Sequence, residues 1–167
     1  MTTRTAAPIK VIAEPGLPFV GTEREVDAPR DLVFRCFAEP ELLARWLGPK
    51  RLEMRIDEFD FRDGGRYRYA NIEPDGTEYG FHGVFHGTPT PDNMTQTFEF
   101  DGAPGHVSLD HMELVDLGGE RTLIRVHSVF QSVEARDAMV THGMADGMEQ
   151  GYQKLEALVA ELRAAGR

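Results

Sequence analysis

The side chains best suited to acid–base chemistry are carboxylates clustered in one predicted strand. Asp57, Glu58 and Asp60 are close neighbours, and strand alternation places Glu58 and Asp60 on one face. If that face bordered a cavity, desolvation would raise the pKa of both carboxyls and suit them to proton transfer. The alternative is a solvated strand edge, where Arg66 and Arg68 of a neighbouring strand form ion pairs with these carboxylates. We expect the solvated edge and assign no catalytic residue.

The sequence lacks the usual patterns for metal binding and nucleophilic catalysis. His82 and His86 are four residues apart on a predicted strand, which separates them by about 13 Å, too far to share a metal ion. Cys36 lies among apolar residues of a predicted helix, where a thiol is buried and inert. The chain has no nucleophile elbow, phosphate loop or dinucleotide motif. We therefore expect no metal site and no cofactor.

Charge and composition narrow the range of partners. The chain has 167 residues and a formal net charge of −10, which disfavours binding to nucleic acids and anionic membranes. A single cysteine cannot form a disulfide within the chain and fits a reduced, cytoplasmic setting. No segment has the apolar core of a signal peptide or the about 18 consecutive apolar residues of a membrane span.

Proline and glycine residues divide the chain into predicted elements. Residues 1–8 are small and polar and predict a flexible N-terminus, and residues 9–163 are expected to form a single domain. Asp27 can cap a short helix. Pro40 begins a second short helix, which ends at Gly48.

From about residue 51 to 130 the pattern changes to strands. Apolar and polar residues alternate, and short turns separate the runs, which predicts an antiparallel meander. A long helix follows, beginning near Val133, bending near Gly143 and ending by Arg163. This order of elements is typical of an α+β fold in which the sheet buries its apolar face against the last helix. Residues 9–13 and 19–26 are expected to be extended and separated by a turn. After the two short helices, strands are expected at 51–56, 66–69, 78–87, 93–100, 107–116 and 121–130.

Glycines recur at every fourth position in the first half of the long helix. Gly143, Gly147 and Gly151 lie near one helical face, and interior glycines each cost a helix about 1 kcal/mol relative to alanine. One interpretation is a gap that leaves a pocket beside the helix. The other is that Gly143 marks a bend or helix start and the remaining two let neighbouring elements pack closely. The residues that would rim such a pocket are Met144, Met148 and Tyr152.

Five stretches of the chain together resemble one known family. They are VDAPRDLVF (26–34), LLARWLGP (42–49), RDGGRY (62–67), PDGTEY (74–79) and GMADGM (143–148). With these motifs the chain is similar to the bacterial branch of the START-like, or SRPBCC, superfamily, which is named after the C-terminal domain of the activator of the heat-shock-protein-90 ATPase. The resemblance covers roughly residues 18–163.

The resemblance implies a helix-grip fold. This is a curved antiparallel sheet of about six to seven strands wrapped around a long C-terminal helix, with two short helices after the first strand and an apolar cavity inside. Trp46 could be a gate that contacts a ligand or a plug of the core, and each aromatic residue could be plain core. The residues expected to line the cavity are Trp46, Met54, Tyr67, Tyr69, Phe81, Phe98, Met144, Gly147, Met148, Gly151 and Tyr152.

Three functions remain open at this point. The leading hypothesis is non-catalytic binding of a small apolar or amphipathic molecule, since superfamily members bind lipids, sterols or polyketides. The second is an enzyme of the polyketide cyclase or dehydratase type, which would need an inward-facing acid–base pair. The third is a protein-interaction module, including one that regulates a chaperone. A homodimer would be compatible with each of them.

Overall fold

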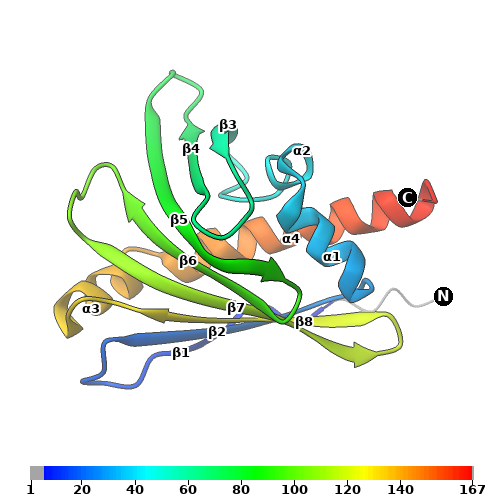
Figure 1. Ribbon diagram of the computed structural model, residues 1–167, viewed down its shortest axis with the longest axis horizontal. Helices are drawn as coiled ribbons and strands as arrows, with labels where there is room; N and C mark the ends of the chain where they lie inside the picture. The colour runs from blue at the N-terminus through cyan, green and yellow to red at the C-terminus, as the bar shows by residue number, and fades with distance from the viewer. Residues whose placement is uncertain (1–5, 167) are drawn as a thin grey trace.

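The computed structural model describes residues 6–166, so most of the predicted flexible N-terminus, residues 1–5, lies outside the described residues. Within that range, eight strands form one antiparallel sheet in the order β1-β2-β8-β7-β6-β5-β4-β3 (Figure 1). The strands are β1 (Lys10–Ile12), β2 (Phe19–Val26), β3 (Glu53–Phe59), β4 (Arg66–Ile72), β5 (Glu78–Thr90), β6 (Asn93–Phe100), β7 (Val107–Gly118) and β8 (Arg121–Val129).

Four helices accompany the sheet in the described part of the chain. Their bounds are α1 (Arg30–Ala38), α2 (Pro40–Leu43), α3 (Val133–Thr141) and α4 (Met144–Ala164). Figure 1 shows the sheet curving and α4 running across it, with α1 and α2 near the second half of α4. The helix-grip expectation is confirmed, with eight strands rather than six to seven because residues 10–12 pair with β2 as an edge strand. No helix among residues 6–166 has the length and apolar character needed to cross a membrane.

Short turns set the register of the meander. Between β4 and β5, Gly76 has a φ of +92°, and the backbone N–H of Thr77 donates to Asp75 Oδ1 at 2.9 Å. Glycine reaches this left-handed region without strain, and aspartate caps such turns through its side chain. Across the resulting hairpin, Tyr69 lies opposite Phe81. The turn therefore places these two aromatic residues side by side on the sheet.

The predicted long helix is two helices. Ser132 caps α3, with its Oγ accepting from the backbone N–H of Ala135 at 3.1 Å. Gly143 then has a φ of +82° and stands at the N-cap of α4. A bend at Gly143 was the expectation, and the structure instead has a complete break there, because the left-handed conformation at this residue interrupts the helical backbone.

The core lies between the second half of α4, helix α1 and the middle of the sheet. Leu155 and Cys36 have no exposed surface, and neither does Ile124 of β8. The expectation that Cys36 is buried is confirmed, and burial raises the pKa of its thiol to about 11, which favours the protonated form. The buried apolar side chains that α4 contributes are Tyr152, Leu155, Leu158, Val159 and Leu162.

Candidate functional site

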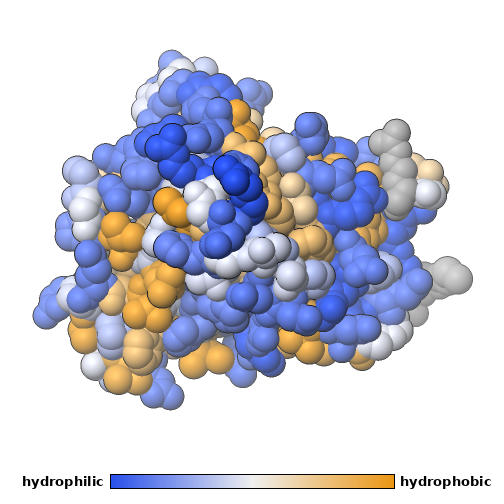
Figure 2. All heavy atoms as spheres, viewed as in Figure 1, coloured by the Kyte–Doolittle hydropathy of each residue, from blue (hydrophilic) through white to orange (hydrophobic). Residues whose placement is uncertain are grey.

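A pocket of about 650 Å³ lies between the sheet and the first half of α4. Its walls are predominantly apolar, and in Figure 2 apolar surface is visible between the projecting end of the β4–β5 hairpin and the helices α1 and α2. Methionines line it at Met94, Met112, Met139, Met144 and Met148. Aromatic residues line it at Phe37, Trp46, Phe59, Phe61, Tyr67, Tyr69, Tyr79, Phe81, Phe85, Phe98, Phe130 and Tyr152.

The structure brings the expected cavity residues together with one exception. Met54 is half-buried on β3 and is not among the residues that line the pocket. Its partner across the ladder, Asn71, lines the pocket instead, as does Ile56 on its own strand. Alternation identified the correct face of β3 but not which position on that face borders the space. The expected residues that do line the pocket are Trp46, Tyr67, Tyr69, Phe81, Phe98, Met144, Gly147, Met148, Gly151 and Tyr152.

The three regularly spaced glycines serve three different purposes. Gly143 supplies the left-handed conformation before α4. At Gly147 a Cβ would meet only Pro49 Cγ, at 3.9 Å, so this position is open. At Gly151 a Cβ would lie 3.1 Å from the carbonyl oxygen of Trp46, which is a close backbone approach. Only Gly147 therefore leaves a gap beside the helix, as the first interpretation expected. Gly143 marks a helix start and Gly151 allows close packing, as the second interpretation expected.

The segment 46–49 is clamped between α4 and the sheet. Gly48 has a φ of +94°, and a Cβ there would lie 3.0 Å from Asn71 Oδ1 on β4. On its other side, the same segment approaches Gly151 of α4. Trp46 is 2% exposed, its indole N–H donates to the carbonyl of Cys36 at 2.9 Å, and its ring stacks on Tyr152. Trp46 is thus a core residue that also forms part of the pocket wall.

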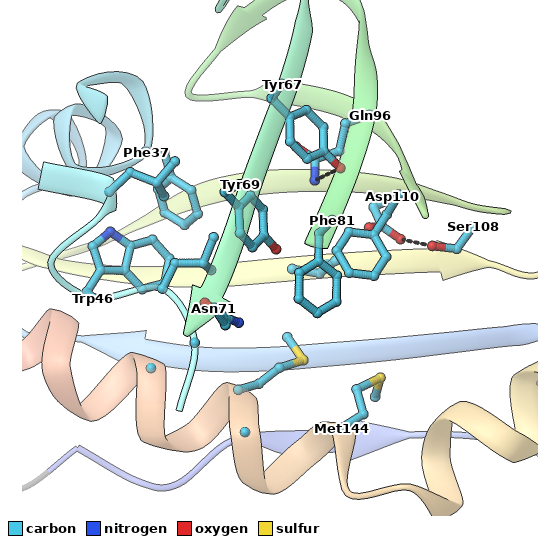
Figure 3. A pocket seen from close by; sticks show the side chains of 18 of the residues that line it. Phe37, Trp46, Tyr67, Tyr69, Asn71, Phe81, Gln96, Ser108, Asp110 and Met144 are labelled. Carbon is cyan, nitrogen blue, oxygen red and sulfur yellow. Dashed lines mark hydrogen bonds between the residues drawn. The ribbon is translucent and has the colours of Figure 1, made fainter. Parts of the chain in front are cut away.

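A row of aromatic rings forms one side of the pocket, and Figure 3 shows three of its members, Tyr67, Tyr69 and Phe81. Ring centroids are separated by 5.2 Å between Phe85 and Tyr67 and by 6.2 Å between Tyr67 and Tyr69. The next separations are 5.2 Å from Tyr69 to Phe81 and 5.3 Å from Phe81 to Phe98. These spacings are those of favourable aromatic pairs, so the row is a rigid apolar surface.

A set of polar side chains crosses the same face of the sheet, and the sequence analysis did not find it. Gln96, Asp110 and Ser128 lie directly opposite one another on β6, β7 and β8, and all three line the pocket. We call these three residues the polar rung. Ser108 Oγ donates to Asp110 Oδ1 at 3.2 Å, and Gln96 Nε2 donates to the hydroxyl of Tyr67 at 3.3 Å. The rung introduces polar groups into an otherwise apolar wall.

The Asp110 carboxyl is the titratable group most affected by this environment. Burial raises its pKa, and hydrogen bonds from Ser128 and Ser108 oppose that rise only in part. On β7 the residues at 108, 110, 112 and 114 share a face, and Leu114 among them is 1% exposed. In the sequence the opposite face carries Val107, Leu109 and Val115, so alternation alone did not show that Asp110 faces inward.

The carboxylates considered for acid–base chemistry are largely engaged in ion pairs. Glu58 lines the pocket and forms the expected cross-strand pair with Arg66 at 3.3 Å, where the two side chains are 45% and 70% exposed. Arg68 pairs instead with Asp101 at 2.7 Å. A register shift between Ile56 and Glu58 breaks the regular alternation of β3. The solvated-edge interpretation therefore holds for Glu58.

The other two carboxylates of this cluster have arginine partners close in sequence. Asp57 pairs with Arg55 at 2.7 Å, and Asp60 pairs with Arg62 at 2.8 Å. His82 lies 2.7 Å from Asp101 through its Nδ1. Among the residues that the structure describes, no group of three or more histidine, cysteine, aspartate or glutamate side chains could hold a metal ion.

Comparison with known proteins finds the same architecture in several bacteria. The sequence model of a family described as activator of Hsp90 ATPase homolog 1-like protein matches residues 27–160. A crystal structure from Rhodobacter sphaeroides is 25% identical, with a TM-score of 0.83 over 92% of this chain and 99% of that one. An NMR structure from Arthrobacter aurescens is 25% identical, with a TM-score of 0.81 over 91% of each chain. A crystal structure from Mycobacterium smegmatis is 20% identical, with a TM-score of 0.81 over 93% and 97%, and shares the fold. The search of curated proteins gives no match.

Proposed function

Because this chain belongs to the family of activator of Hsp90 ATPase homolog 1-like proteins, matched over residues 27–160, we propose that it is a cytoplasmic protein that binds a small hydrophobic or amphipathic molecule. The binding site is the pocket between the sheet and α4. The observation that supports this most is the pocket itself, with about 650 Å³ of space inside a single domain-sized chain. Pockets of roughly 300–1,000 Å³ are typical of small-molecule sites.

Burial of apolar surface supplies the affinity in this proposal. Each square ångström of apolar surface removed from water contributes roughly 25 cal/mol, so a guest that covers the aromatic row gains substantially from this term alone. Met144 and Met148 line the pocket from α4, and their unbranched side chains adapt to guests of different shape. The polar rung then orients the guest by hydrogen bonding. The mechanism is sequestration, with no bond made or broken.

A test by mutation starts at Gly147, where the helix leaves open space. Gly147→Phe places a ring in the pocket, whereas Gly147→Ala adds one methyl group at a position where the nearest atom is 3.9 Å away. We expect the wild type and Gly147→Ala to enhance the fluorescence of Nile red, a neutral apolar dye, and Gly147→Phe to lose that enhancement. Equal enhancement by all three folded proteins would contradict binding in this pocket.

A second test identifies the natural guest. Native mass spectrometry of protein purified from its own cells, followed by organic extraction, should reveal a co-purifying small molecule. Gly147→Phe purified in the same way is the matched control and should carry less of it. A wild type that is always empty and that fails to bind Nile red would overturn the proposal.

One observation favours a second candidate function. Asp110 is a carboxyl with a raised pKa in the wall of an apolar pocket, which is an environment suited to proton transfer. An enzyme of the polyketide cyclase or dehydratase type would use such a group as a general acid or base. Turnover of a bound polyketide-like substrate that is lost in Asp110→Asn while binding persists would favour this candidate over sequestration.

A further inference from the structure

The pocket wall offers a carboxyl with no basic partner. Among residues 6–166, no lysine, arginine or histidine side chain forms a salt bridge with Asp110, whose side-chain partners are the hydroxyls of Ser108 and Ser128. A carboxylate in a poorly hydrated site is stabilised most by a nearby cation. The protein itself does not supply that cation at Asp110.

The basic residues that line the pocket are already engaged elsewhere. Arg51 donates to Glu73 at 2.7 Å, and Arg68 donates to Asp101 at 2.7 Å. The third, His142, has its Nδ1 against the carbonyl of Ala138 in its own helix. The charge at Asp110 is therefore available to a guest.

A second buried group in the pocket wall also lacks a partner. Asn71 is 7% exposed, and its Oδ1 has no hydrogen-bond partner in the structure. That oxygen faces Gly48 and has almost no accessible surface, so a guest in the pocket does not reach it. Asp110 is therefore the acceptor that the pocket wall presents to a guest. A guest with several N–H donors would satisfy its carboxylate better than one with acceptors.

Aromatic faces stand beside the polar rung. Phe98 lies opposite Ser108, one same-face position along the strands from the pair formed by Gln96 and Asp110. Figure 3 shows the rings of Tyr69 and Phe81 on the side of the pocket next to Asp110. A cation within about 6 Å of a ring centroid is attracted by the negative face of the ring. A carboxylate next to aromatic rings is a suitable environment for a protonated amine attached to an apolar body.

We propose that the guest of this pocket is a hydrophobic amine, whose ammonium group is held by Asp110 and whose apolar body lies along the aromatic row Phe85, Tyr67, Tyr69, Phe81 and Phe98. This inference rests on the proposed binding function and narrows it to one class of ligand. An ammonium group has three donors and no acceptor, which matches the ionised carboxylate of Asp110, an acceptor only. A neutral alcohol of the same shape has one donor and no charge, and therefore binds more weakly.

The test uses two probes that differ only in this group. Isothermal titration calorimetry at neutral pH compares 2-(2-naphthyl)ethylamine, which is protonated, with 2-(2-naphthyl)ethanol. We expect the wild type to bind the amine at least about tenfold more tightly, because only the amine forms a charge pair with Asp110. In Asp110→Asn the affinity for the amine should fall to that for the alcohol. The affinity for the alcohol should change by less than about threefold. Asp31→Asn removes an exposed carboxylate on α1 and should keep the preference.

Each outcome decides the inference. Equal binding of the two probes by the wild type would contradict the inference that the guest is an amine, and so would an unchanged preference in Asp110→Asn. Neither result would contradict the proposed binding function. Failure of both probes to bind the wild type overturns the amine as well, and Nile red binding then shows separately whether the pocket accepts apolar guests. If Asp110→Asn no longer binds either probe, the inference is tested on the wild-type protein alone. Carbon-13 NMR of its aspartate carboxyls must then show a shift at Asp110 with the amine and none with the alcohol.

Discussion

The two halves of α4 face the same sheet but are held by different interactions. In the second half, Leu155, Val159 and Leu162 are at most 3% exposed and pack into the core. In the first half, Met148 is only partly buried and Gly147 has open space beside it. One continuous helix thus serves as a packed support at its C-terminal end and as a pocket wall at its N-terminal end. Because the second half of α4 is packed into the core, it can hold the first half in position although few side chains pack against that first half.

Ion pairs replace apolar packing where the first half of α4 meets β2. Arg24 is 4% exposed, and its Nε and Nη2 donate to Glu149 at 3.0 Å and 3.1 Å. Its Nη1 also donates to Glu156, just inside the second half of α4, at 3.0 Å. The backbone N–H of Ile9 also donates to Glu149, at 2.8 Å. These contacts lie beside the pocket rather than in it. The pocket half of the helix is therefore anchored by charge, whereas the core half is held mainly by burial.

The largest expected difference between the halves is in the cost of removing a side chain. Leu155→Ala should lower the free energy of unfolding by about 3 kcal/mol, because a fully buried leucine leaves a cavity in a packed core. Met148→Ala should lower it by less than about 1 kcal/mol, because Met148 already borders empty space. Urea denaturation measures both values. Equal losses would show that the first half is packed as tightly as the second.

The next comparison uses two glycines one turn apart. Gly151→Ala should destabilise the protein by about 1–2 kcal/mol, because its Cβ would press on the Trp46 carbonyl in a segment clamped by Asn71. Gly147→Ala is the matched control and should stabilise it by up to about 1 kcal/mol through helix propensity. Thermal unfolding of the two variants gives opposite shifts in Tm. Stabilisation by both substitutions would mean that the segment 46–49 can move away from α4.

The smallest effect concerns acid stability. Burial would raise the pKa of Glu149, but hydrogen bonds from Arg24 and the Ile9 N–H outweigh it and leave that pKa lowered. A lowered pKa in the folded state contributes stability above the unfolded value of about 4.5, and this contribution is lost as the pH falls through the folded value. Glu149→Gln should therefore cost about 1 kcal/mol near neutral pH, and the cost should shrink below about pH 4.5.

Urea denaturation at a series of pH values measures that cost. Glu161→Gln removes a carboxylate that is 60% exposed in its pair with Arg45 and should change stability by only a few tenths of a kcal/mol. A cost at Glu149 that is independent of pH would contradict the role given to its charge. A pH-dependent cost supports the anchoring of the first half of α4 by its ion pair.

Local patterns were enough to predict most of the fold. Turn residues such as Asp75 and Gly76, and the alternation within each strand, give the order of elements and the antiparallel meander. The resemblance to the START-like superfamily added the curvature of the sheet and the cavity. The sheet has one strand more than expected, because β1 pairs with β2 at the edge. Whether so short a segment pairs depends on its partner strand and not on the sequence of its three residues.

The details of the site depended on contacts between distant parts of the chain. Gly147 and Gly151 have the same type and spacing, and the difference between them is set by the segment 46–49, which lies about a hundred residues away. Met54 is on the face of β3 that borders the pocket, but the pocket does not extend to its position. Asp110 was missed because a lone carboxylate on a strand usually faces water. Its inward orientation follows from the register with Gln96 and Ser128.

The break between α3 and α4 has a consequence for how fast a guest could come and go. His142 and Gly143 form a short join between the two helices and line the pocket beside Met139 of α3, and Gly143 carries the left-handed conformation. A guest that passed this side of the pocket would meet the join, while the eight strands and the packed end of α4 stayed in place. We expect residence time to be governed by these few residues, and equilibrium affinity by the sheet beneath them.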